Sequence, residues 1–235
     1  MFHTIFYVPL YNALVFLSSI MPGGDIGLAI ITLTILVKVI LFPLFQKATI
    51  TQMMMKKVEP DIARIKETYK NDQQTQTLKI LDVYKSNKIN PFVSFLVLLV
   101  QLPIILALFW VFKAGFAFSP DELYSFVTIP AVLSTKLFGV FSILDKSWML
   151  ALLTGITQYI QTTLILPKTP PKKEDSKPNF KEDFARSMNM NMRYFMPVLI
   201  TGIAYTLSSA IAIYWITSNL FSIGQEYYIR KVKKY

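Results

Sequence analysis

Four long stretches of this chain carry no acidic side chain, and they constrain its fold more than any other feature. A membrane-spanning helix needs about 20 mostly apolar residues, and three of the stretches each fit one span. The last is too long for one ordinary span, and the pair Ser208-Ser209 divides it into two. We therefore predict five transmembrane helices. The stretches are Ile26–Phe45, Pro91–Phe112, Trp148–Leu166 and Tyr194–Gln225.

The composition narrows the class of protein further. Hydrophobic residues make up 53% of the chain and charged residues 16%, against about 25% charged residues in soluble domains. There is no cysteine, which excludes disulfides, thiolate metal sites and a cysteine nucleophile. The single histidine, His3, excludes histidine-rich metal sites and histidine-based catalytic triads. We expect no enzyme activity, no cofactor and no metal.

The net charge of +10 is concentrated in three regions that alternate with the spans. Thr49–Asn90 holds eight Lys or Arg residues, Pro167–Arg193 holds seven and Arg230–Tyr235 holds four. The remaining loop, Ala114–Ser147, holds two. Basic loops stay on the cytoplasmic side of a bilayer. The N-terminus is therefore predicted outside and the C-terminus in the cytoplasm, and no direct nucleic acid partner is needed to explain the charge.

Two segments outside the spans have helical patterns. In Thr49–Asn90, Met54, Val58 and Ile62 begin an apolar stripe at helical spacing, and the turn signal Asn71-Asp72 precedes a second helix. Pro60 is expected to kink or restart the first of these helices. Ile5–Met21 has two interpretations, an amphipathic helix in the interface or a sixth span, and we favour the first because of its polar side chains.

The predicted fold is an all-α polytopic membrane protein. It is a five-transmembrane-helix bundle with an N-terminal interfacial helix and a cytoplasmic antiparallel helical hairpin. In chain order the parts are the interfacial helix at 1–24, the first span at 25–46, the hairpin at 47–90, the second span at 91–113, an external loop with a short helix at 114–147, the third span at 148–166, a cytoplasmic loop at 167–193, the fourth and fifth spans at 194–208 and 209–229, and a basic cytoplasmic tail at 230–235.

Lys38 lies deep in the first span. About eight residues separate it from the cytoplasmic end, roughly 12 Å at the helical rise. A central lysine costs roughly 2.5–3.5 kcal/mol in a membrane helix, and the five spans contain no Asp or Glu to pair with it, since Glu226 lies only at an inner edge. Lys38 either snorkels to the cytoplasmic headgroups or faces a water-filled cavity. At this depth we expect the cavity.

Polar side chains in the other spans are suited to line such a cavity. Thr154, Gln158 and Gln161 share one helical face, and a second face carries Trp215, Ser218 and Asn219, followed by Ser222. The alternative is that they form hydrogen bonds between helices. The candidate groove residues are Lys38, Thr34, Gln101, Thr154, Gln158, Gln161, Trp215, Ser218 and Asn219.

Five short motifs in order resemble the YidC family of membrane protein insertases, which has mitochondrial and chloroplast relatives. Two departures are visible: Lys38 stands where the family usually has arginine, and Ser208-Ser-Ala-Ile replaces Pro-Ala-Gly-Leu. The motifs are Tyr7-Val-Pro-Leu-Tyr-Asn-Ala-Leu, Ile40-Leu-Phe-Pro-Leu, Val58-Glu-Pro-Asp-Ile, Gln101-Leu-Pro-Ile, and Tyr214-Trp215 with Ser218-Asn219.

The resemblance implies a polar groove that is open to the cytoplasm and to lipid, closed to the outside, and faced by a positive residue at Lys38. It also implies the bacterial cytoplasmic (inner) membrane, nascent membrane proteins as substrates, and a bilayer with anionic lipids. Contacts with the ribosome and the Sec translocon are left open. Met53, Met54 and Met55 are predicted to contact substrate, or else to pack the hairpin. The rival functions are a small-solute or anion channel, or facilitator, and an assembly scaffold for a membrane complex.

Overall fold

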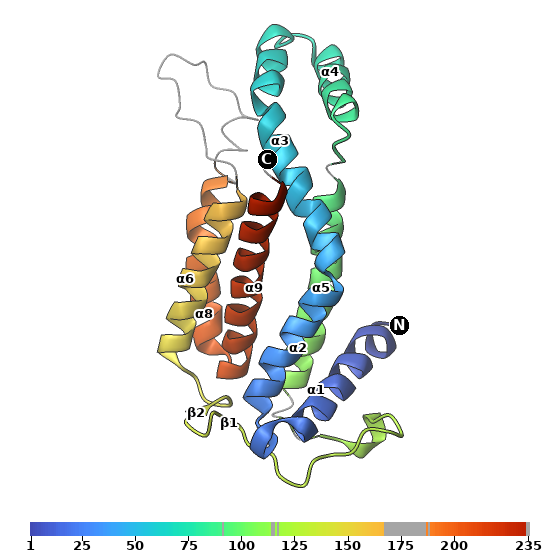
Figure 1. Ribbon diagram of the computed structural model, residues 1–235. Coiled ribbons are helices and arrows are strands. Elements are labelled where there is room, and N and C mark those ends of the chain that lie inside the picture. Colours follow the sequence, from blue (N-terminus) through green and yellow to red (C-terminus); the bar gives the residue numbers. More distant parts are fainter. Residues whose placement is uncertain (91, 114–115, 117, 167–186, 188, 234–235) are drawn as a thin grey trace. The chain divides into compact units, whose positions relative to one another are not determined.

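The computed structural model describes residues 1–90, 92–113, 116, 118–166, 187 and 189–233, without the side chains of residues 94, 95, 97, 98 and 233. Most of the predicted loop 167–193 lies outside these residues. The described part is mainly helical, and the predicted helical class is confirmed (Figure 1). Its elements are η1 (His3–Tyr7), α1 (Val8–Ile20), η2 (Pro22–Gly24), α2 (Ile26–Ile40), α3 (Phe42–Thr68), α4 (Gln73–Ser86), α5 (Phe92–Lys113), η3 (Pro120–Glu122), β1 (Lys136–Leu137), β2 (Phe141–Ser142), α6 (Trp148–Ile165), η4 (Asn191–Phe195), α8 (Met196–Thr206) and α9 (Ser209–Lys233).

The chain divides into two compact units. The first, which we call the bundle unit, comprises Met1–Ile40 and Leu102–Gly224, and the second, the hairpin unit, comprises Leu41–Gln101 and Gln225–Tyr235. Both units are built from segments that are distant in the sequence.

One helical run among the described residues, His3–Ile20, is long and apolar enough by itself to cross a bilayer. A second results if α2 and α3 count as one broken span. Helices α6 and α9 contain threonine, glutamine, serine and asparagine, which lower the mean hydropathy. The number of five spans therefore remains a prediction.

The predicted first span, 25–46, is interrupted at Leu41. Pro43 explains the break, because it has no N–H to bond the carbonyl of Val39 and its ring crowds that position. At the second position of α3 the missing N–H costs nothing, since helix-start donors have no intrahelical partner. Helix α3 continues through Pro60, so the predicted restart there is absent.

In the hairpin unit, α3 and α4 form the two arms of an antiparallel pair (Figure 1). Asp72 is the N-cap of α4, and its carboxylate accepts hydrogen bonds from the backbone N–H (3.0 Å) and the hydroxyl (2.6 Å) of Thr75. The Gln76 amide donates to the carbonyl of Lys66 at 3.1 Å and so fastens α4 to the end of α3. Val58 is buried and belongs to the apolar stripe of α3.

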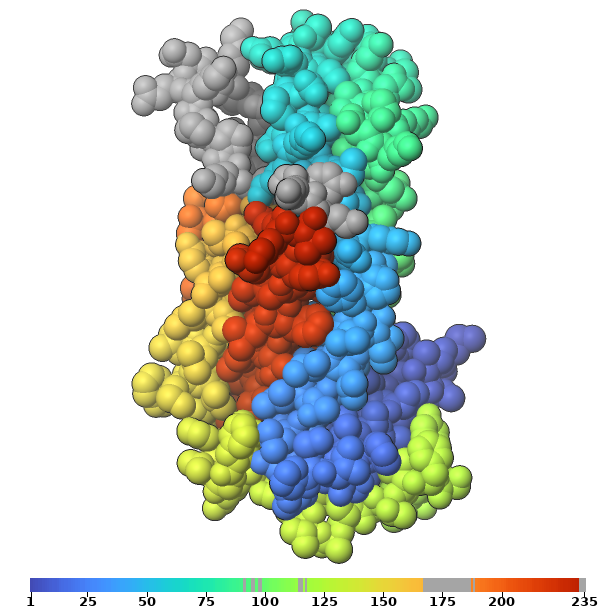
Figure 2. All heavy atoms as spheres, in the orientation of Figure 1, coloured from blue at the N-terminus to red at the C-terminus, as the bar shows by residue number. Residues whose placement is uncertain are grey.

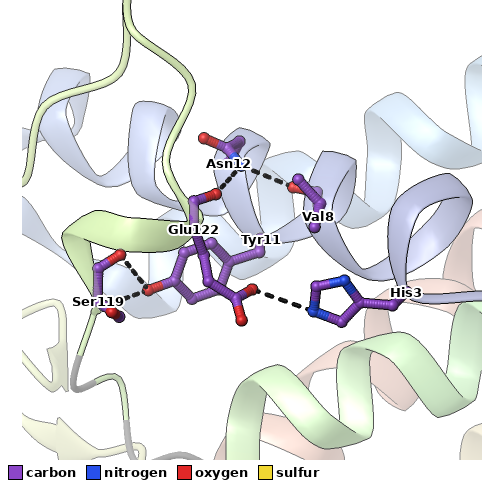
Figure 3. Close-up of polar contacts among 6 residues, drawn as sticks. All are labelled: His3, Val8, Tyr11, Asn12, Ser119 and Glu122. Carbon is purple, nitrogen blue, oxygen red and sulfur yellow. Dashed lines mark hydrogen bonds and ion pairs between the residues drawn. The ribbon is translucent and has the colours of Figure 1, made fainter.

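The external loop was predicted to contain a short surface helix after Ser119, and Ser119 is the N-cap of the element found there. A single 3₁₀ turn, η3, forms there, because the side chain of Asn12 binds the backbone that would extend it (Figure 3). Its Nδ2 donates to the carbonyl of Glu122 at 2.8 Å, and its Oδ1 accepts from the N–H of Tyr124 at 2.7 Å. Tyr11, one residue earlier, donates its hydroxyl to the carbonyl of Ser119 at 3.4 Å.

An antiparallel two-stranded hairpin, β1–β2, also stands in this loop and was not predicted. Asp25 connects it to α2: one carboxylate oxygen caps α2 at the N–H of Leu28 (3.0 Å), and the other accepts from the N–H of Phe138 (2.8 Å). The N–H of Ala210 donates to the carbonyl of Ile143 at 2.9 Å, which connects the loop to the start of α9. The N–H of Ser134 donates to the carbonyl of Gly24 at 2.9 Å, and the N–H of Ile26 donates to the carbonyl of Ser134 at 3.0 Å. We call these bonds together the outer clamp of the bundle unit.

Helices α6 and α8 pack closely through small residues. A Cβ on Gly155 would lie 1.9 Å from the hydroxyl oxygen of Thr201, so only glycine allows this approach. Ala151, Ala204 and Ala212 form a buried cluster beside it.

Candidate functional site

Lys38 is buried in the bundle unit, with 5% of the residue exposed. Its Nζ donates to the Oγ of Ser222 on α9 at 3.2 Å. The Ser222 hydroxyl in turn donates its single hydrogen to the carbonyl of Ser218 at 2.9 Å. Because that hydrogen is committed to α9, the oxygen lone pairs are available to the ammonium group.

The sequence of α2 explains which side the lysine occupies. Ile35, Leu36 and Val39 are exposed, and they cover the outward face of the helix. Thr34, one turn before Lys38, is buried on the other face and donates its hydroxyl to the carbonyl of Ile30 at 2.7 Å. Lys38 therefore lies on the inward, packed face of an otherwise apolar helix.

A second polar contact joins α9 to α6. The Nδ2 of Asn219 donates to the Oγ1 of Thr157 at 3.1 Å, and Thr157 donates to the carbonyls of Leu153 (2.9 Å) and Thr154 (3.0 Å). Asn219 and Ser222 are three residues apart on α9, so they are neighbours on its surface. The inward face of α9 thus contacts α2 through the hydroxyl of Ser222 and α6 through the amide of Asn219.

Part of the predicted groove set is buried in the same unit. Thr34, Lys38, Thr154, Ser218 and Asn219 are all buried in the bundle unit. Gln158 is half-buried and donates to the hydroxyl of Thr162 on its own helix at 3.3 Å. Gln161 is also half-buried.

The remaining predicted residues lie elsewhere. Trp215 is half-buried in the bundle unit and lines a small apolar cavity with Leu108, Phe112 and Tyr214. Gln101 and the three methionines Met53, Met54 and Met55 belong to the hairpin unit, and all four are half-buried.

Two residues of the site were missing from the predicted set. Ser222 lies on the predicted face of α9 but beyond the residues selected, and it contacts Lys38 directly. Thr157 follows Thr154 by three residues, a spacing that places both on one side of a helix. The signal for both was helical spacing, whereas the partner of each depends on tertiary packing.

The acidic residue of α9 is paired within its own helix. In the hairpin unit, the Oε1 of Glu226 accepts from both the Nε (2.9 Å) and the Nη2 (2.7 Å) of Arg230. Two charge-assisted bonds that converge on one oxygen hold the carboxylate in place. Glu226 is itself buried.

A family model described as "60Kd inner membrane protein" matches residues 16–235 of the chain. The chain belongs to this family. It is also 32% identical over 208 residues to "Membrane protein insertase YidC" of Fusobacterium nucleatum, covering 88% of this chain and 87% of that protein. The protein of the same name from Clostridium tetani is 32% identical over 221 residues, 93% of this chain and 89% of the relative.

The longer relative from Francisella tularensis subsp. novicida carries the same name and is 30% identical over 215 residues. These are 88% of this chain and 33% of that protein. The resemblance to the YidC family predicted from the sequence motifs is therefore confirmed, and members of this family are membrane proteins.

Proposed function

We propose that this protein is a membrane protein insertase, which passes hydrophobic segments of nascent proteins from the cytoplasm into the bilayer. The observation that carries the proposal is Lys38, a cation on the inward face of an apolar helix, held by a hydroxyl group of a facing helix. The names of the relatives point the same way. No step of this process requires covalent chemistry.

The mechanism follows from the cost of moving polar groups through hydrocarbon. A substrate segment is apolar and partitions into lipid by itself, but its polar flank must cross as well. We infer that Lys38 and the neutral polar groups of Thr154, Ser218 and Asn219 line a hydrated groove that lowers this cost. A positive charge there attracts an acidic flank, and the apolar segment leaves sideways into lipid. Gln101 and the methionines of α3 are proposed as further contacts along the path.

The proposed topology has the external loop outside and the helical hairpin, residues 47–90, in the cytoplasm. The contacts of α1 support an interfacial position for this helix rather than a span. Asn12, near the middle of the run His3–Ile20, binds the backbone of Glu122 (Figure 3) and of Tyr124. The Nε2 of His3 lies 3.4 Å from the Oε2 of Glu122 (Figure 3). If α1 crossed the bilayer, this charged loop segment would lie at the hydrocarbon centre, which is costly. The outer clamp is consistent with a groove closed to the outside.

The charge at position 38 provides the test. Insertion rates are measured in proteoliposomes for one single-span substrate whose translocated tail is acidic, neutral or basic. Lys38→Arg should keep the rates, and Lys38→Gln should slow the acidic tail most, by about ten- to hundredfold, which corresponds to about 1.4–2.7 kcal/mol. Lys38→Glu should be slowest for acidic tails. The matched control is Lys47→Gln, which removes one exposed charge from α3.

Equal losses for all three tails would reject charge attraction and leave hydration of the groove as the role of Lys38. Wild-type insertion by all Lys38 variants would contradict the proposed site. Passage of small anions without any effect on insertion would instead support a channel.

A further inference from the structure

We propose that the β1–β2 hairpin of the external loop is an anchor that inserts its tip into the outer leaflet of the bilayer. The proposal concerns a surface that the insertion mechanism does not use. It depends on the proposed external position of the loop and not on insertion activity.

The hairpin tip is apolar and exposed. Phe138 and Val140 leave 66% and 71% of their surface uncovered, and Phe141 is also exposed. Single exposed apolar residues are ordinary, but a contiguous group of them marks a contact surface. Phe138 and Val140, on either side of Gly139, form such a pair at the tip, and Phe141 follows them in the sequence.

The backbone conformation at the tip is unfavourable for the aromatic residue Phe138. Phe138 and Gly139 both have positive φ, 53° and 73°, and the N–H of Val140 closes the turn on the carbonyl of Leu137 at 3.1 Å. Turns with two such residues favour Asn-Gly, and a bulky residue at positive φ is disfavoured. The chain therefore places a phenylalanine where the backbone prefers asparagine. Exposure to water would add to that cost, whereas contact with an apolar medium would offset it.

The tip cannot fold back into the bundle unit, because its base is fixed. Leu137 and Ile143 are buried and occupy the inward positions of the hairpin. The N–H of Phe138 donates to Asp25 at 2.8 Å, and the carbonyl of Ile143 accepts from Ala210 at 2.9 Å. The side chains at the tip are therefore held in an exposed position by the fixed base of the hairpin.

The exposed apolar surface of the tip lies next to an exposed apolar stripe on α6, and this indicates lipid as the partner. Figure 2 shows the loop around the hairpin bordering the first turns of α6. Trp148, Leu152 and Ile156 are exposed at steps of four residues, so they form a stripe along this membrane-protein helix. Lys136 in β1 and Lys146 just before α6 are exposed and suit lipid phosphates. Tryptophan and lysine near a helix start are typical of the bilayer interface.

The test uses the absence of cysteine from the sequence. A single cysteine is placed at Phe138, labelled with an environment-sensitive NBD fluorophore, and the protein is reconstituted in nanodiscs containing anionic phospholipid. Quenching is compared for a lipid with a shallow spin label and for aqueous iodide. We expect the spin-labelled lipid to quench the fluorophore at position 138 and iodide to leave it unquenched. A label at Leu152 on α6 should behave in the same way, and a label at Gln74 on α4 should be quenched by iodide and not by the lipid. Iodide quenching would overturn the proposal, and so would protection from both quenchers, which would indicate a protein partner.

A variant separates anchoring from folding. Phe138→Asn removes the ring and suits the positive φ, so the thermal midpoint in detergent should be unchanged or raised. In the Phe138→Asn background, the quenching by lipid of a fluorophore attached at Val140→Cys should fall at least twofold. The control, Phe126→Asn, changes another exposed aromatic residue of the loop and should leave this quenching unchanged. Unchanged quenching in Phe138→Asn, or a clear loss of thermal stability, would assign Phe138 to packing and refute the anchor.

Discussion

Ser222 on α9 presents its hydroxyl oxygen to the ammonium group of Lys38 on α2 at 3.2 Å. Hydrogen bonds to charged groups contribute about 1.5–3 kcal/mol. A double-mutant cycle of Lys38→Met and Ser222→Ala, measured by thermal unfolding in detergent, should give a coupling of about 1 kcal/mol or more. The cycle Lys47→Met with Ser222→Ala serves as the control and should be additive. Additivity in the first cycle would mean that the contact does not contribute.

Access of water to the buried lysine is the second expectation. A cysteine at position 38 should react with a water-soluble maleimide added from the cytoplasmic side, since the proposed groove opens there. A cysteine at Ile35, on the exposed apolar face of the same helix, should react slowly, and one at Glu59 on α3 should react rapidly. Labelling at Glu59 alone would show that the site of Lys38 is dry.

The contact between Gly155 and Thr201 makes α6 sensitive to one methyl group. Gly155→Ala should destabilise the protein by about 1–3 kcal/mol, because Thr201 must rotate or the helices must separate. Gly202→Ala, one residue beyond Thr201, meets no atom within 4 Å and should be neutral or stabilising by up to about 1 kcal/mol. Thermal midpoints of the two variants would distinguish them, and equal midpoints would contradict the close packing of α6 on α8.

The cap of α4 should be sensitive to pH. Hydrogen bonds from the side chain and backbone of Thr75 hold the pKa of the Asp72 carboxyl below its usual value. A carboxyl with a lowered folded-state pKa stabilises the fold above its unfolded pKa of about 4, and this contribution is lost as the pH falls through the folded value.

Hydrogen exchange across α4 should therefore accelerate at pH 3 relative to pH 7, after correction for intrinsic rates. Asp72→Ala should exchange rapidly at both values. Asp82→Ala, an exposed position within the same helix, should keep the wild-type pH dependence. A pH dependence that persists in Asp72→Ala would assign it to another group.

The helical class and the family could be predicted because they depend on features that are local in the sequence. Long apolar stretches impose helices, and short motifs in a fixed order identify relatives. The break at Leu41 was not predicted, although Pro43 is a local signal for it, because the apolar pattern continues through this position.

Contacts between distant segments could not be read in this way. Asn12 and Glu122 are 110 residues apart, and nothing near Glu122 indicates that an amide side chain will end its helix after one turn. The same holds for Ser222 as the partner of Lys38. Helical spacing placed Ser222 on the correct face of α9, but only the packing of α9 on α2 makes the two residues meet.

The outer clamp has a consequence for how freely this part of the chain can change during evolution. Besides the two bonds of the Asp25 carboxylate, the clamp joins Ser134 to Gly24, Ile26 to Ser134 and Ala210 to Ile143 through backbone N–H and carbonyl groups alone. These groups are the same in every residue except proline, which lacks the donor. Substitutions that preserve the path of the backbone therefore leave these bonds in place. Homologues that share about a third of their residues with this chain can retain the same closure with different loop sequences, and proline at a donor position is the replacement that selection should remove.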